Sequence, residues 1–144
     1  MYDRILVGID GSEVSLQALK QAVDLARLLG SEITVVSVIN EMKMPFSAEF
    51  GLWARESHEN LIRKVLESLN SAIVKIGENH PNMKVEARIE EGRPAKKITE
   101  IANTEGFDLI VIGRRGNGLV DHLVMGSVSS EVVRTSHTPV LIVG

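Results

Sequence analysis

The chain has 144 residues, with 16 Lys and Arg against 19 Asp and Glu, a net charge of −3 and no cysteine. This charge, without a basic run, argues against a nucleic-acid partner, and the missing cysteine excludes disulfides and thiol chemistry. Aromatic residues make up 3%, which leaves no platform for stacking bases or a flavin ring. Because no apolar run approaches a membrane span and Met1 leads directly into a strand pattern, we expect one cytoplasmic domain over residues 1–144, without a membrane segment or cleavable signal.

The chain begins with a predicted strand, helix and strand. Ile5–Ile9 is a mostly apolar run that suits a strand covered on both faces, and Asp10–Ser12 follows as a turn and helix cap. A helix is predicted from about Glu13 to Leu29, with Gly30 as its C-cap. Ile33–Ile39 is β-branched and nearly all apolar, so it predicts a second buried strand. These elements form a right-handed βαβ unit.

Residues Asn40–Glu56 break this pattern with a connection rich in large apolar side chains. These side chains are Met42, Met44, Phe46, Phe50, Leu52 and Trp53. One interpretation is a mobile lid or partner surface, since flexible Met-rich surfaces re-pack against several partners. The other is an irregular segment folded onto its own domain. The next helix is predicted from about Ser57 to Gly77.

The C-terminal half predicts three further strands. Alternating apolar and polar residues over Val85–Glu90 favour an edge strand, and Pro94 begins a short helix. A buried strand at Leu109–Ile112 precedes a glycine-rich loop, after which Ser127 caps a helix and Val140–Val143 forms the last strand. Five strands with alternating helices predict a doubly wound α/β sandwich.

The loop from Gly113 to Gly126 has the physical properties of an anion site. Glycine lets the backbone approach a ligand, and free N–H groups at the following helix N-terminus favour a phosphate. Ligands of open parallel sheets bind beyond the carboxyl ends of the strands, where the winding direction reverses. Asp10, after the first strand, and the loop after the fourth can share a ligand only if these strands are neighbours. That condition implies the order 3-2-1-4-5.

The candidate residues have simpler alternatives. Asp10 is either a turn former or helix cap, or a ribose acceptor, because a carboxylate accepts from two hydroxyls. Arg114 and Arg115 are either solvated charges or phosphate ligands. The serines after the loop, Ser127–Ser130, have no evident base, and the four histidines are too scattered for a metal site. These histidines are His58, His80, His122 and His137.

The glycine loop has the spacing G-x2-G-x9-G-S, formed by Gly113, Gly116 and Gly126-Ser127. This spacing resembles the nucleotide-binding motif of the universal stress protein family. The resemblance extends from I-L-V-G-I-D-G-S near the start to T-P-V-L-I-V-G at the end. It implies the same strand order and a regulatory protein that binds ATP or AMP. It also implies a homodimer joined through Val140–Val143 and an unidentified protein partner.

The resemblance also implies roles for individual residues. Asp10 matches a ribose-binding aspartate, Val38 a position whose backbone recognises adenine, and Arg115 a cationic or histidine position. The other matching positions are Gly8, Ile9, Gly113, Gly116, Gly126, Ser127, Val128 and Ser129. Mg²⁺ or Mn²⁺, where present, sits on the phosphates, so no protein ligand is named. Asp121 departs from the family pattern, in which Lys or Arg is frequent.

Two alternative functions remain open beside this one. A slow ATP hydrolase would use the same phosphate-positioning groups, but the sequence shows no base or water-orienting residue for it. A flavodoxin-like electron carrier would use the same kind of switch point.

Overall fold

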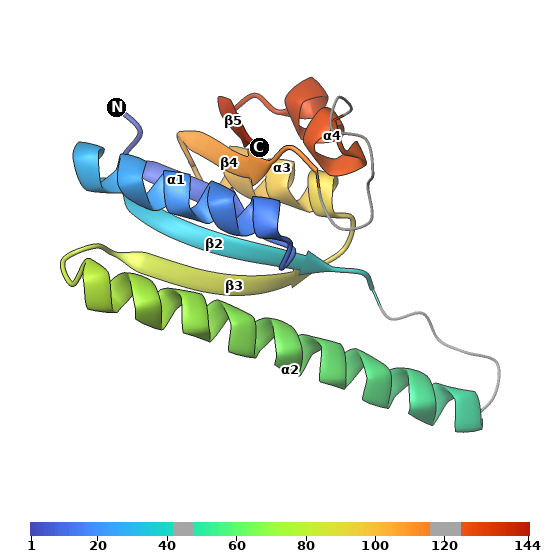
Figure 1. Cartoon of the computed structure of the whole chain (residues 1–144). Coiled ribbons are helices and arrows are strands. Elements are labelled where there is room, and N and C mark those ends of the chain that lie inside the picture. The colour runs from blue at the N-terminus through green and yellow to red at the C-terminus, as the bar shows by residue number, and fades with distance from the viewer. Residues whose placement is uncertain (42–47, 116–124) are drawn as a thin grey trace.

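The structure is a computed structural model that describes residues 1–41, 48–115 and 125–144 (Figure 1). Strands and helices alternate along the chain. In order they are β1 Arg4–Gly8, α1 Glu13–Leu29, β2 Glu32–Ile39, α2 Ala48–Asn79, β3 Val85–Glu91, α3 Pro94–Thr104, β4 Leu109–Gly113, α4 Ser127–Thr135 and β5 Val140–Val143.

The five strands form one parallel sheet in the order β3-β2-β1-β4-β5, which confirms the predicted α/β fold and strand order. Helices α1 and α2 cover one face and α3 and α4 the other (Figure 1). The central strand β1 therefore points Ile5 and Val7 toward α1 and Leu6 toward α3, and all three side chains are fully buried. The near-continuous apolar runs in the sequence follow from this two-sided burial.

Helix α1 has the predicted bounds because a local capping signal marks each of its ends. The Ser12 side chain accepts a hydrogen bond from the Ser15 backbone N–H at 3.2 Å, which caps the N-terminus. Gly30 has a left-handed backbone with φ of 72°, and its N–H donates to the carbonyl of Ala26.

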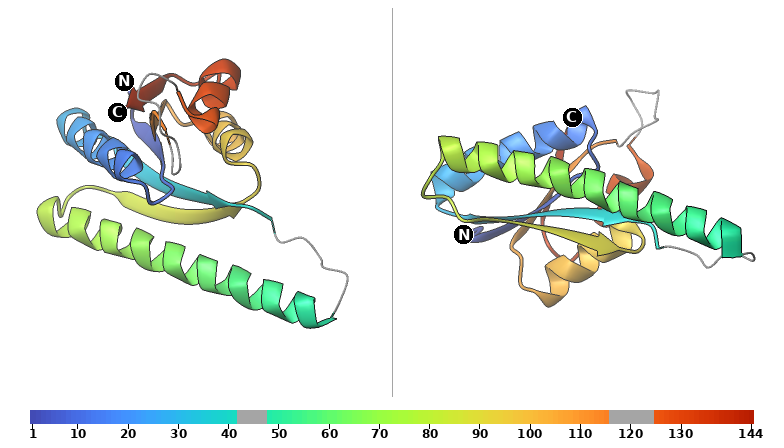
Figure 2. Two further views of the ribbon diagram at one scale, coloured as in Figure 1. Left: turned by 45° about the vertical axis from the view of Figure 1, so that its right-hand side comes forward. Right: turned by 90° about the horizontal axis from the view of Figure 1, so that it is seen from below.

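Helix α2 begins at Ala48, so the prediction of an irregular segment up to Glu56 is wrong for residues 48–56. Adding residues to an existing helix requires no new nucleus, so a packed helix can extend into this region. A helix of 32 residues is about 48 Å long, whereas the seven residues of β3 span about 23 Å. The N-terminal part of α2 accordingly projects beyond the sheet (Figure 2).

The projecting part of α2 is exposed. Among the described side chains of α2, Leu69 and Ile76 are the buried ones, and both lie in its C-terminal half. Leu52 and Trp53 are 59% and 60% exposed, so these two side chains are not folded into the core as one interpretation expected. Met42, Met44, Phe46 and the Phe50 side chain lie outside the described residues.

Strand β3 lies at an edge of the sheet, as its alternating pattern predicted. Arg88 ties this edge to α3, because its guanidinium donates to Glu105 at 2.8 Å and to Glu90 at 2.6 Å. The hydrogen bond to Glu105, followed by the one to Glu90, raises the pKa of Arg88 despite partial burial. The strand edge thus carries charged side chains, a common protection against pairing with other strands.

Helix α4 begins one residue earlier than its predicted cap implies. Gly126 is the N-cap and Ser127 the first helical residue, so the prediction of Ser127 as the cap is wrong. The Gly126 carbonyl accepts the first intrahelical bond, from Ser130 at 3.0 Å. Within the described part of the chain, we find no helix with the length and apolar character needed to span a membrane.

Candidate nucleotide-binding site

A cavity of about 440 Å³ lies at the carboxyl ends of β1, β2 and β4, beside the N-termini of α3 and α4. All the predicted site residues that the structure describes line this cavity. They are Gly8, Ile9, Asp10, Val38, Gly113, Arg115, Gly126, Ser127, Val128 and Ser129. Gly116 and Asp121 lie outside the described residues. Residues more than 100 positions apart in the chain thus line the same cavity. Their contacts with a ligand stay a prediction.

The floor of the cavity consists of apolar side chains that the sequence reasoning did not assign to a site. Val36, Ile98 and Ile112 belong to the buried cluster between the sheet and α3, and each also lines the cavity. Pro94, Met125 and Ser15 complete the residues that were missed. In the sequence, apolar floor residues have the pattern of core residues, so no local signal distinguishes them.

Asp10 forms the turn between β1 and α1. Its Oδ1 accepts a hydrogen bond from the Ser12 backbone N–H at 2.9 Å, and the residue is exposed. The turn-forming interpretation is therefore confirmed. Asp10 also lines the cavity, where its interaction with a ribose remains a prediction.

Gly113 has a packing role that the sequence did not predict, beside the predicted contact with a ligand, which stays a prediction. A Cβ atom added there would lie 2.8 Å from Val14 Cγ1, 3.2 Å from the Val14 carbonyl carbon and 3.3 Å from the Ser15 nitrogen. The end of β4 therefore needs glycine because the first turn of α1 approaches it closely. This approach brings the Asp10 turn and the start of the glycine loop together.

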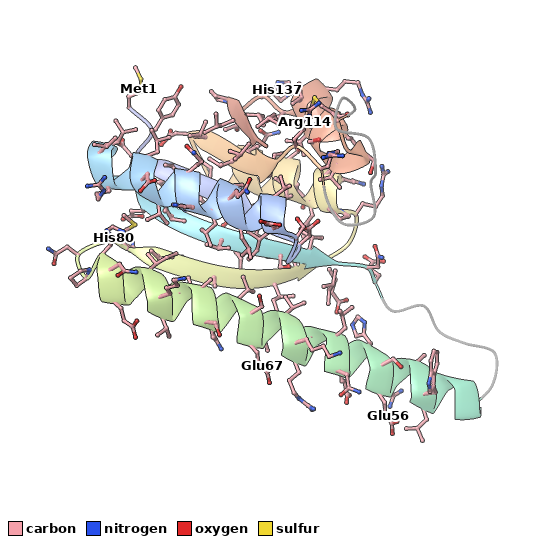
Figure 3. The ribbon with its side chains drawn as sticks, in the orientation of Figure 1. Met1, Glu56, Glu67, His80, Arg114 and His137 are labelled. Atoms are coloured by element: carbon pink, nitrogen blue, oxygen red, sulfur yellow. The ribbon has the colours of Figure 1, made fainter. Side chains whose placement is uncertain are left out.

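The N-terminus of α4 forms part of the cavity lining. An α-helix leaves its first four N–H groups without intrahelical acceptors. The Gly126 N–H donates to the Arg114 carbonyl at 2.8 Å, and Arg114 lies beside α4 (Figure 3). The N–H groups of Ser127, Val128 and Ser129 have no acceptor within the helix, and all three residues line the cavity. The geometry suits an anion, and Arg115 adds a positive charge.

The described histidines do not gather at this cavity. His80 follows the C-terminus of α2 and His137 precedes β5, far from one another (Figure 3). His58 instead lies 2.9 Å from a carboxylate oxygen of Glu91. Over residues 1–41, 48–115 and 125–144 there is no group of three His, Asp or Glu side chains that could hold a metal ion.

A second cavity, of about 600 Å³, lies beyond the ends of β2 and β3 and beside the first turns of α3. Both signs of charge line it. The charged residues are Glu41, Glu91, Arg93, Lys96, Lys97 and Glu100. None of the predicted site residues is among them, and the Arg93 side chain is directed to Glu131 on α4, 2.9 Å away.

The sequence profile of the universal stress protein family matches residues 1–144. The chain belongs to this family. Among its relatives, the universal stress protein YxiE of Bacillus subtilis is 33% identical over 149 residues, which cover 99% of each chain. The family that the motif predicted is therefore confirmed.

Two solved structures of universal stress proteins are similar to this fold. UspA from Lactobacillus plantarum superimposes with a TM-score of 0.89 at 21% identity, covering 99% of this chain and 98% of that one. A universal stress protein solved in complex with cAMP gives a TM-score of 0.75 at 26% identity, covering 99% and 97%.

Proposed function

We propose that this protein is a cytoplasmic adenine-nucleotide-binding regulatory protein that takes ATP or AMP in the 440 Å³ cavity. The observation that carries the proposal is the meeting of the Asp10 turn with the N-terminus of α4 across the ends of β1 and β4. This is the position at which open parallel sheets bind ligands.

The two ends of the cavity differ in the way that a nucleotide requires. At one end, Arg115 and the first N–H groups of α4 favour phosphate. At the other end, Val36, Val38 and Ile98 offer an apolar floor for a base. With aromatic residues at 3% of the chain, aliphatic side chains are the available surface for such a base. Mg²⁺ or Mn²⁺ would be held through the phosphates.

A solved relative supports adenine as the base. The universal stress protein of 26% identity was solved in complex with cAMP, which is an adenine nucleotide with one phosphate. The family resemblance assigns the ribose to Asp10 and the adenine edge to the backbone of Val38, and both residues line the cavity here. A ligand that spans the cavity would therefore have its sugar near β1 and its phosphate near α4.

In the proposed mechanism the protein acts by binding the nucleotide and not by catalysing a reaction. A nucleotide that bridges Asp10, on the β1–α1 turn, and the start of α4 would connect segments that are more than 100 residues apart in the chain. Its binding would then change which surface a homodimer, paired through β5, presents to a protein partner. Binding free energy that differs between two states is what lets a ligand shift their populations.

The alternative of a slow ATP hydrolase predicts a different result from the same protein. In the described part of the lining, Asp10 is the one carboxylate, and its Oδ1 already accepts from Ser12. Single-turnover hydrolysis of ATP by wild type and by Asp10→Ala separates the two functions. We expect no turnover above the uncatalysed rate, whereas hydrolysis that disappears in Asp10→Ala would establish the enzyme.

Mass spectrometry of the small molecule released by denaturing freshly purified protein identifies the natural ligand. We expect an adenine nucleotide in stoichiometric or near-stoichiometric amount. Release of a flavin or another cofactor in its place would contradict the proposal.

A further inference from the structure

Gly8, the last residue of β1, and Ile98 of α3 share one space beneath the cavity floor. A Cβ atom added at Gly8 would lie 2.9 Å from Ile98 Cδ1 and 3.1 Å from Ile112 Cγ2. Real Cβ atoms do not approach a carbon atom to 2.9 Å, so any side chain at position 8 must displace the end of Ile98. The position of the Ile98 methyl group thus depends on the missing side chain of Gly8.

The cavity adjoins this contact, because Gly8, Ile98 and Ile112 all line it. Ile98 is 4% exposed, and away from the cavity it packs within the cluster that contains Leu6, Ala102 and Val132. Protein interiors are close-packed, so these neighbours leave no room for a displaced Cδ1. Rotation of Ile98 would move the methyl group into the cavity that it already lines.

We propose that Gly8 and Ile98 act as a pair that sets the depth of the cavity and, through it, the affinity for the nucleotide base. Gly8 is a positioning residue, because the absence of its Cβ keeps Ile98 Cδ1 withdrawn from the cavity. Ile98 is the residue that determines the depth, because its end forms the floor. This inference rests on the proposed function that the cavity binds an adenine nucleotide.

A purely structural role for Gly8 makes a different prediction. If glycine served only the packing of β1 against α3, Gly8→Ala would lower the stability of the fold, and ligand affinity would change only as far as unfolding removes protein. In the proposed role the end of a flexible side chain moves into open space. The melting temperature then changes little while affinity falls.

A double-mutant cycle with calorimetric titration of AMP tests the pair. Gly8→Ala is expected to weaken AMP binding by roughly tenfold. Ile98→Val removes Cδ1 and leaves Cγ1, which lies 3.8 Å from the added Cβ, an ordinary contact distance. The double variant Gly8→Ala/Ile98→Val is therefore expected to recover most of the lost affinity, with the remainder due to Ile112.

Two further variants keep the test decisive. Ile98→Met lengthens the side chain toward the cavity at nearly constant volume, so it should weaken AMP binding without any change at position 8. Leu6→Val alters the same strand and the same core cluster but does not line the cavity, so AMP affinity should stay at the wild-type value.

The possible outcomes are distinguishable. Wild-type affinity in Gly8→Ala and in Ile98→Met, or a double variant that binds no better than Gly8→Ala, would overturn the inference and leave the proposed function intact. A folded wild-type protein that binds neither AMP nor ATP would overturn the proposed function and this inference together.

Discussion

The hydroxyl oxygen of Ser129 lies 2.6 Å from the carbonyl oxygen of Arg114, to which it donates a hydrogen bond. The Gly126 N–H donates to the same carbonyl at 2.8 Å. Both contacts fasten the first turn of α4 to the end of β4. Because Ser129 is 2% exposed and its proton is used within the protein, its hydroxyl has a structural role that the expectation of phosphate binding did not include. Ser127, in contrast, is exposed at the cavity.

This difference predicts opposite effects for two serine variants. Ser129→Ala removes a buried hydrogen bond and should lower the free energy of unfolding by about 1 kcal/mol. Ser127→Ala should leave that free energy unchanged and weaken nucleotide binding. Urea denaturation and calorimetric titration of both variants check the pair. Weaker binding in Ser129→Ala at unchanged stability would show that the Ser129 hydroxyl turns to the ligand instead.

Gly113→Ala should destabilise the fold by about 2 kcal/mol, because the added Cβ meets backbone atoms of α1 that cannot rotate away. Gly77→Ala is the matched control. Gly77 lies near the C-terminus of α2 with nothing within 4 Å of an added Cβ, so alanine should stabilise the helix by up to about 1 kcal/mol. The denaturation midpoints of the two variants are compared with that of the wild type. An equal shift in both variants would mean that the approach of α1 to β4 does not require glycine at position 113.

Local signals allowed the bounds of α1 and the neighbouring positions of β1 and β4 to be predicted. Ser12 and Gly30 define the ends of α1 by their own chemistry. The pairing of β1 with β4 follows from where Asp10 and the glycine loop must meet, and the full strand order is also what the family resemblance implies. The start of α2 could not be predicted, because residues 48–56 extend past the sheet and none of the side chains of residues 51–56 is buried.

The packing role of individual glycines could not be predicted from the sequence either. A glycine motif indicates that something approaches the backbone, but it does not identify the neighbour. At Gly113 the neighbour is α1, and at Gly8 it is the side chain of Ile98. Such neighbours come from distant parts of the chain and become visible once the elements are packed.

Strand β5 is the second edge of the sheet, and its Leu141 is 37% exposed. An exposed apolar edge favours pairing with another strand, so we expect a homodimer in which the same patch serves both subunits. Leu141→Lys should shift the protein toward monomer in sedimentation velocity. Leu28→Lys, on α1 with 74% exposure, provides a control with the same change of charge. A dimer that persists in Leu141→Lys would place the interface elsewhere.

Asp121 lies outside the described residues, and its effect on ligand choice stays a prediction. The family resemblance implies that this carboxylate lies on the phosphate side of the pocket. A carboxylate several ångströms from a phosphate in a partly solvated cleft is worth about 1 kcal/mol of repulsion, more for ATP than for AMP. Asp121→Lys should therefore tighten ATP more than AMP, and salt should reduce the difference. Dissociation constants at low and high salt measure this. An equal response of both nucleotides would show that Asp121 has no bearing on phosphate number.

The central claim is that the cavity between the Asp10 turn and α4 holds an adenine nucleotide. Calorimetric titration of ATP and AMP into wild type and Gly126→Val tests it most directly. Gly126 is the N-cap of α4, and its φ of −68° is one that valine adopts, so the substitution introduces no backbone strain there. We predict saturable binding at one site per chain in the wild type and a loss of at least about a hundredfold in affinity in the folded variant. Wild-type affinity in Gly126→Val, or no binding of either nucleotide to the wild type, would contradict the account.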